Sequence, residues 1–439
     1  MKKSFYIYSL GCPKNSVDSQ SMAELLRKNG YAYAADQHSA DVIIVNTCGF
    51  IEPARQEALD LLKEIASEKH TSQCLIAAGC LTQRESEWVA KQVPGVNAML
   101  GTRRWMDILS VVKKLDEPAQ TNIRFINTSP LTMEAEDIPR VVHYGGYAYL
   151  KIADGCDRRC AFCAIPIIKG PQVSRRIENI LHDVSRLADL KIQELILIAQ
   201  DLTSYGHDMG MKDGLPDLLI EIMKTAPHIP WVRLLYTYPG QISSRLIDMM
   251  AEQPRLLPYL DIPLQHAHPD VLRRMYRPAN MDHVRDTIQE MRARVPNLAI
   301  RSTFIVGFPG ESDTEFRNLL DFVAEVQFDR VGIFPYYHEK GTAAYQLQDD
   351  VSPELKEERI QQLVALQEGI SEQKNRQFIG KKMEVIVDGV GDGMTICRSY
   401  RDAPEIDGMV MVEDELEMGK ITVVEITAAL VHDLIAKKI

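Results

Sequence analysis

The chain has 439 residues, and at roughly 100 to 200 residues per domain this length predicts two to four domains. Hydrophobic residues make up 45% of it and charged residues 25%, which excludes a disordered, collagen-like or coiled-coil chain. Acidic residues outnumber basic ones, 61 to 50, and the net charge of −11 argues against a protein whose whole surface grips nucleic acid. The eight cysteines are too few for a secreted disulfide scaffold and leave a metal or redox role open.

The sequence offers no membrane segment, because no stretch approaches the roughly 18 consecutive apolar residues that a spanning helix needs. The short apolar run at 5–10 includes Ser9 and two tyrosines, and it is shorter than the apolar core of a signal peptide. We therefore expect a cytoplasmic protein, in which reduced thiolates can bind metal.

The first part of the chain alternates short β-branched runs with amphipathic helical stretches. The expected strands are 5–11, 41–47, 73–79 and 96–101, and the expected helices are 18–28, 54–66, 86–92 and 105–115. This alternation predicts βαβ units and a doubly wound parallel sheet, in a domain that we place at 1–125. Ligand sites in such sheets gather outside the carboxyl ends of the strands.

A second series of strands and helices follows a proline-rich and acidic stretch at 117–144, which we interpret as a linker. Its expected strands are 147–153, 194–199, 231–236, 260–263, 299–306 and 330–335. Six strands with intervening helices predict a complete or partial (β/α) barrel, in a domain at 140–372. Ser352 and Pro353 suit the start of its last helix.

The last 60 or so residues consist of short alternating runs separated by glycine and acidic turns, which predicts a small antiparallel β-barrel at 375–439. The glycines at 389–393 are interpreted as a hairpin turn, because they lack the strand-to-helix context of a nucleotide-binding loop. From residue 376 onward there are eight Lys or Arg and twelve Asp or Glu, a local net charge of −4. Such a barrel repels a phosphate backbone and complements a basic protein.

The strongest chemical signal is the C-x3-C-x2-C motif of Cys156, Cys160 and Cys163, directly after the first strand of the barrel series. Three thiolates this close can hold three corners of a [4Fe-4S] cluster and leave the fourth iron without a protein ligand. Structural zinc is the alternative, but it normally takes four ligands, and no fourth Cys or His stands nearby.

This motif in this position resembles the radical S-adenosylmethionine superfamily. The resemblance implies a partial (β/α)6 barrel, S-adenosylmethionine bound at the open iron, and its cleavage to a 5′-deoxyadenosyl radical that abstracts hydrogen from carbon. It also implies that the backbone at Phe162 contacts the adenine, that Gln200 and Asp201 lie where the methionine part is bound, and that Gly307 and Gly310 approach the adenosine. A loop or cap role for Gln200 and simple turns at the two glycines remain alternatives.

A second cysteine trio is dispersed in the sequence. Cys12, Cys48 and Cys80 each follow an expected strand of the first domain, so they should converge at one sheet edge. A redox pair with a spare thiol, or a nucleophile, is possible chemistry for them, but a second three-cysteine [4Fe-4S] cluster accounts better for the trio. Cys74 and Cys397 are interpreted as small buried hydrophobes.

The three-part layout resembles the radical methylthiotransferases across essentially the whole chain, and their terminal barrel is called TRAM. Four strings, GCPKNSVDS, NTCGFI, DIPLQHA and RSYRDAPEIDG, resemble the branch that acts on small-subunit ribosomal protein uS12. The resemblance implies conversion of a uS12 aspartate to 3-methylthioaspartate, with two [4Fe-4S] clusters and S-adenosyl-L-methionine as cofactors.

The same resemblance implies a reductant such as flavodoxin or ferredoxin. It also implies that the enzyme binds uS12, either as the free protein or on the ribosome. We expect no transfer RNA partner. Two alternatives stay open: a methylthiotransferase for adenosine in transfer RNA, and a non-catalytic iron-sulfur electron carrier or RNA-binding module. No catalytic side chain is predicted. His266 in DIPLQHA is either a hydrogen-bonded structural histidine, which is the preferred interpretation, or a residue that handles a proton or touches substrate. Asp261 is left without an assigned role, and orienting a neighbouring loop is one alternative for it.

Overall fold

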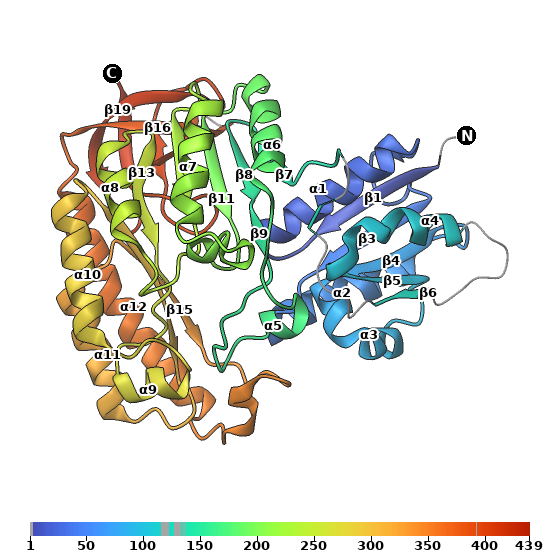
Figure 1. The fold of residues 1–439 in the computed structure, drawn as a ribbon, viewed down its shortest axis with the longest axis horizontal. Coiled ribbons are helices and arrows are strands. Elements are labelled where there is room, and N and C mark those ends of the chain that lie inside the picture. The colour runs from blue at the N-terminus through green and yellow to red at the C-terminus, as the bar shows by residue number, and fades with distance from the viewer. Residues whose placement is uncertain (1–2, 116–122, 127–132, 135–136, 392) are drawn as a thin grey trace.

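Three parts follow one another along the chain (Figure 1). The structure, a computed structural model, describes residues 3–115, 123–126, 133–134, 137–391 and 393–439. The N-terminal sheet and its helices lie to one side of the larger central part, and the C-terminal barrel packs at one end of the central strands. No helix in these described ranges is long and apolar enough to cross a membrane.

The N-terminal part is a parallel sheet with the strand order β2-β1-β3-β4-β5-β6. Its strands are β1 (Ser4–Ser9), β2 (Ala32–Tyr33), β3 (Val42–Thr47), β4 (Cys74–Gly79), β5 (Ala98–Gly101) and β6 (Ile123–Phe125). Its helices are α1 (Pro13–Lys28), α2 (Glu52–Glu68), α3 (Cys80–Gln92), the short 3-10 helix η1 (Thr102–Asp107) and α4 (Ile108–Leu115). Apolar side chains of α1 and α4 cover one face of the sheet and those of α2 and α3 cover the other, which confirms the doubly wound arrangement.

The central part is an open sheet with the order β15-β14-β13-β12-β11-β8-β7. Its strands are β7 (Val141–Tyr144), β8 (Tyr147–Lys151), β11 (Glu194–Ile198), β12 (Trp231–Leu234), β13 (Leu256–Asp261), β14 (Ala299–Val306) and β15 (Arg330–Pro335). The covering helices are α6 (Ile177–Asp189), α7 (Gly214–Thr225), α8 (Ser244–Glu252), α9 (Pro269–Arg274), α10 (Met281–Arg294), α11 (Asp313–Val326) and α12 (Pro353–Arg376). Six strands from β8 to β15 are parallel, which confirms the partial (β/α)6 barrel.

Two sequence-based expectations about strands were wrong. The segment interpreted as a linker contains β6, which extends the first sheet, and β7, which pairs antiparallel with β8. The fourth barrel strand is β13 at Leu256–Asp261 and not 260–263. Pro258 interrupts this strand, and the register with β12 shifts there, so the ladder tolerates a residue without an N–H.

The C-terminal part is a closed barrel in the order β16-β17-β18-β20-β19. Its strands are β16 (Lys382–Gly391), β17 (Met394–Ser399), β18 (Val410–Val412), β19 (Ile421–Ala429) and β20 (Leu434–Lys438). The β18–β20 pairing is parallel, so the barrel is not wholly antiparallel as expected, because a fifth strand follows the four predicted runs and closes it. The expected hairpin turn joins β16 to β17.

Buried charges fix the terminal barrel to the central sheet. Arg330 of β15 pairs with Asp402 at 2.6 Å, and the Tyr259 hydroxyl donates to Asp407 at 2.6 Å. Arg233 donates to the carbonyl of Tyr400 at 2.8 Å. The RSYRDAPEIDG segment therefore packs against the inner face of the central sheet.

Candidate active site

A cavity of about 470 Å³ lies where the N-terminal and central parts meet, and both cysteine trios line it. Its lining includes two further residues predicted for cofactor contact, Phe162 and Gln200. The dispersed cysteines arrive from the N-terminal sheet and the contiguous ones from the loop after β9 (Ala153–Asp154). The structure thus brings all six predicted metal-ligating cysteines to one space.

The contiguous trio stands on a loop whose backbone leaves little freedom. Gly155 has φ +79°, and a Cβ there would lie 2.1 Å from the carbonyl oxygen of Pro171, so only glycine fits. The Cys156 N–H donates to the carbonyl of Gly170 at 3.1 Å, which ties the loop to the residues after α5 (Ile165–Ile168). The first cysteine is therefore held by backbone contacts before any metal binds.

The dispersed trio stands where strands end and helices begin. Cys12 is the N-cap of α1, Cys80 is the first residue of α3, and Cys48 precedes α2. A helix N-terminus carries partial positive charge and stabilises a thiolate or another anion. The helix termini at Cys12 and Cys80 would therefore help to hold an anionic metal-thiolate group once metal is bound.

Two glycines set the spacing of this trio. A Cβ on Gly11 would lie 2.8 Å from the Cβ of Cys48, so Gly11 allows the first two loops to touch. Gly79 has φ +99°, and a Cβ there would lie 2.4 Å from Oδ1 of Asn46. Glycine at both positions lets Cys80 approach the other two strand ends.

Burial dominates the acidity of the cysteine thiols. Desolvation raises the pKa of Cys80 to about 12, of Cys163 to about 12 and of Cys156 to about 11. Burial also raises the pKa of Cys48. These thiols are therefore protonated at neutral pH in the metal-free protein, and metal binding has to displace their protons.

The donor chemistry of the two trios suits iron better than structural zinc. Thiolates are soft ligands for iron, whereas structural zinc normally takes four protein ligands. Each trio presents three cysteines to the cavity, and no histidine of the described residues lines it. Three cysteines can hold three corners of a [4Fe-4S] cluster and leave the fourth iron open. The residues present therefore fit such clusters, and a cluster at the dispersed trio stays a prediction.

Gln200 supplies an unsatisfied acceptor to the cavity. Its Nε2 donates to Asp154 at 2.5 Å, while its Oε1 is buried without a hydrogen-bond partner. A buried acceptor without a partner costs free energy until a donor reaches it. The ammonium group of a bound S-adenosylmethionine is a donor of the right kind, so Gln200 fits the contact predicted for it.

Phe162 lines the cavity, and its loop packs against Phe308 and Tyr336. Gly307 and Gly310 are not among the cavity-lining residues of the described chain. Both have positive φ, +71° and +74°, which is reason enough for glycine. Their contact with the adenosine stays a prediction.

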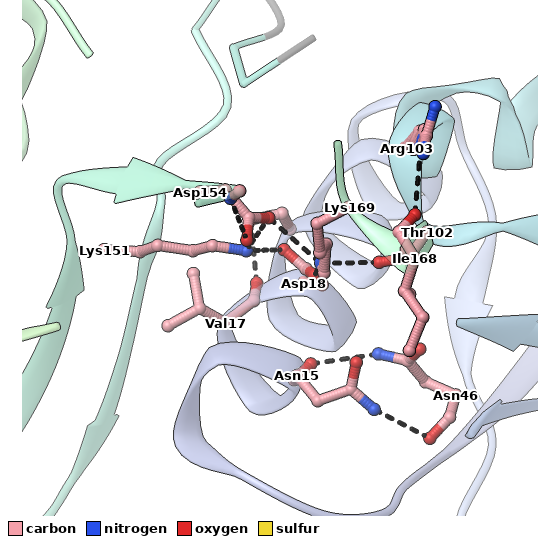
Figure 2. Close-up of polar contacts among 12 residues, drawn as sticks. Asn15, Val17, Asp18, Asn46, Thr102, Arg103, Lys151, Asp154, Ile168 and Lys169 are labelled. Carbon is pink, nitrogen blue, oxygen red and sulfur yellow. Dashed lines mark hydrogen bonds and ion pairs between the residues drawn. The ribbon is translucent and has the colours of Figure 1, made fainter. Parts of the chain in front are cut away.

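A buried group of charges joins the N-terminal part to the central part (Figure 2). Asp18 of α1 accepts from Lys151 at 2.8 Å and pairs with Lys169 at 3.1 Å, and it also pairs with Arg140. Lys169 pairs with Asp154 at 3.0 Å. Burial alone would raise the pKa of Asp18, but the surrounding cations hold it well below its usual range. This ion cluster fixes how the two trios face each other.

Sequence reasoning missed most of the charged residues of the cavity. Arg158 pairs with Asp201 at 2.8 Å, and the Lys14 ammonium lies 3.3 Å from the ring centroid of Tyr236. Arg277 donates to the sulfur of Cys160 at 3.6 Å. Lys14 stands in the GCPKN string, so the motif held a signal, but its position against the barrel wall required the fold.

The two unassigned residues of DIPLQHA have structural partners. Asp261 accepts from Arg301 at 3.0 Å and from the N–H of Tyr236 at 3.2 Å, and it thereby orients the wall of the cavity. His266 is fully buried, its Nδ1 accepts from the N–H of His268 at 3.0 Å, and it does not line the cavity.

The sequence is similar to proteins of one kind over nearly its whole length. It is 46% identical to ribosomal protein uS12 methylthiotransferase RimO of Roseiflexus sp. (strain RS-1), with 98% of this chain and 96% of the relative covered. It is 46% identical to RimO of Chloroflexus aurantiacus, with 98% of each chain covered. It is 41% identical to RimO of Thermoanaerobacter sp. (strain X514), with 99% and 100% covered. The chain belongs to the RimO family.

The parts of this RimO family chain match three domain families in order. Residues 4–101 match Uncharacterized protein family UPF0004, 150–323 match the Radical SAM superfamily and 379–439 match the TRAM domain. Among solved structures, the radical S-adenosylmethionine methyltransferase TsrM from Kitasatospora setae aligns with a TM-score of 0.57 and 12% identity, covering 90% of this chain and 77% of TsrM. That likeness shows the fold alone. The predicted family and fold class are confirmed, while the roles of individual cavity residues stay predictions.

Proposed function

We propose that this chain converts an aspartate of ribosomal protein uS12 to 3-methylthioaspartate, by adding a methylthio group at the β-carbon. The observation that carries the proposal is the convergence of two cysteine trios on one cavity. In the proposed reaction one cluster generates the radical and the other supplies the sulfur, so both have to lie within reach of one substrate carbon. A cavity lined by both trios meets that requirement.

The contiguous cysteines would hold the radical-generating cluster and the dispersed cysteines an auxiliary cluster that binds the sulfur to be inserted. When bound, these groups and two molecules of S-adenosylmethionine supply the radical, the methyl group and the sulfur. Phe162 and Gln200 would position the S-adenosylmethionine. The contact of Lys14 with Tyr236 and the buried ion cluster around Asp18 join the two walls of the cavity.

The choice of uS12 rests on the relatives and on charge. The RimO relatives are named for uS12, and they cover nearly all of this chain. The terminal barrel of net −4 suits a basic ribosomal protein and repels the backbone of transfer RNA. A cytoplasmic location follows from such a substrate, and a low-potential reductant such as flavodoxin or ferredoxin would supply the electron.

Mass spectrometry of uS12 tests the proposal. In a strain that lacks the gene for this chain, the target aspartate should be unmodified, and the wild-type gene should restore one methylthio group. Transfer RNA from the same strains should be unchanged. Loss of a methylthio group from transfer RNA adenosine, with uS12 unaffected, would instead establish the alternative substrate.

A further inference from the structure

Among the described residues, four cationic side chains line the cavity, and three of them have anionic or strong acceptor partners. Arg158 pairs with Asp201, Lys169 pairs with Asp18 and Asp154, and Arg277 contacts the sulfur of Cys160 and the carbonyl of Pro263. Within the described ranges, Lys14 has no carboxylate at ion-pair distance. Its ammonium contacts the Tyr236 side chain and lies 3.3 Å from the ring centroid.

The position of Lys14 differs from that of the two arginines. Lys14 follows Cys12 by two residues at the start of α1, and it reaches from the N-terminal part to Tyr236 on the barrel wall. Arg158 and Arg277 both lie over the ring of Tyr238, beside the contiguous trio. The unpaired ammonium is thus on the side of the cavity where the dispersed trio lies.

A second group beside Lys14 is also unsatisfied. Asn15 is 3% exposed and lines the cavity, and its Nδ2 donates to the carbonyl of Leu10 at 2.8 Å. Its Oδ1 is buried without a partner. The cavity lining thus holds one cation without a carboxylate partner and one acceptor without a donor, which suit an anion and an N–H group of a ligand. A carboxylate-bearing residue of a peptide chain has both.

The geometry points to Lys14 as the side chain that binds the carboxylate of the substrate aspartate and so selects aspartate. This inference rests on the proposed function. The reacting β-carbon has to lie between the two trios, and the carboxylate is bonded directly to that carbon. Within a protein, this carboxylate is the only full charge on the aspartate. An ammonium at the edge of the dispersed trio can hold it while the β-carbon faces the contiguous trio, and Asn15 can accept from a substrate backbone N–H.

Binding of uS12 gives the test, because it does not depend on turnover. The reconstituted enzyme without S-adenosylmethionine is titrated with labelled uS12 and with uS12 whose target aspartate is replaced by asparagine. A charge-assisted hydrogen bond predicts that wild-type enzyme prefers the aspartate form by about 10- to 100-fold. Lys14→Met should remove this preference, and Lys14→Arg should keep part of it. The same change at the exposed Lys63 of α2, Lys63→Met, should leave it unchanged.

A preference that survives Lys14→Met would overturn the inference. So would a changed reduction potential of the auxiliary cluster in Lys14→Met with the aspartate preference intact, because Lys14 would then serve the cluster. Failure of the proposed function has a different signature: wild-type enzyme would leave uS12 unmodified and would bind both forms alike. Iron content and thermal unfolding of Lys14→Met should match wild type, which shows that the variant is folded and loaded.

Discussion

The two cysteine trios reach the same cavity by different routes. Cys156, Cys160 and Cys163 lie within eight residues on one loop, while Cys12, Cys48 and Cys80 come from three strand ends of one sheet. The contiguous trio needs only its loop, but the dispersed trio needs the register of a whole sheet and its docking to the barrel. Damage to the N-terminal sheet should therefore impair sulfur insertion and spare radical formation.

The largest effect is expected from the contiguous trio. Cys160→Ala should abolish cleavage of S-adenosylmethionine, because two thiolates cannot hold the cluster. The measurement is 5′-deoxyadenosine formed by reconstituted enzyme with a chemical reductant. Cys397→Ala is the control, because Cys397 is buried inside the terminal barrel and should leave cleavage intact. Cleavage by the Cys160 variant at the wild-type rate would contradict the assignment.

The dispersed trio should separate product from cleavage. Cys80→Ala should retain 5′-deoxyadenosine formation and lose the methylthio product, because sulfur insertion requires the auxiliary cluster. Cys74→Ala, at the other end of the same strand, should retain both. Both readouts come from one reaction, in which the product is measured by mass spectrometry of uS12. A Cys80 variant that still makes the methylthio product would contradict the assignment of the dispersed trio to sulfur insertion.

Docking of the two parts should depend on Asp18. Asp18→Asn leaves Lys151 and Lys169 less compensated in a buried site, so it should lower the free energy of unfolding by about 3–5 kcal/mol. Because the folded pKa of Asp18 is lowered, its contribution is full above the unfolded value of about 3.9 and is lost as pH falls through the folded value. Denaturation should therefore show a constant difference from wild type near neutral pH and a smaller one in strong acid.

The exposed Asp60 of α2 provides the control for this change. Asp60→Asn should alter the free energy of unfolding by no more than about 0.5 kcal/mol at any of these pH values. Equal effects of Asp18→Asn and Asp60→Asn would mean that the ion cluster does not fix the docking.

The smallest effect should come from the backbone of the dispersed trio. Gly79→Ala forces an added Cβ to within 2.4 Å of Asn46 at positive φ, so it should cost about 1–3 kcal/mol and lower the iron bound by the auxiliary site. Gly30→Ala is the matched control, because Gly30 also has positive φ but has nothing within 4 Å of an added Cβ. Iron content should fall only in the Gly79 variant. An equal loss of iron in both variants would mean that backbone strain at positive φ, and not the contact with Asn46, causes the loss.

The sequence predicted what depends on local spacing or on simple sheet rules. The contiguous trio follows from its spacing, and the convergence of Cys12, Cys48 and Cys80 follows from the meeting of parallel strand ends. The strand at 256–261 was misplaced because Pro258 stands inside it. The ion cluster could not be predicted from the sequence, because Asp18 and Lys151 are 133 residues apart in the chain. Lys14 was visible as part of a motif, but only the fold shows that no carboxylate of the described residues pairs with it.

Iron content tests the central claim of two clusters most directly. Anaerobically reconstituted wild-type protein should bind about eight iron atoms per chain, and the triple variant with alanine at 156, 160 and 163 should bind about four. The remaining cluster of that variant should disappear when Cys80 is also replaced. About four iron atoms in wild type, with none left in the triple variant, would show that the dispersed trio holds no cluster and would contradict the account.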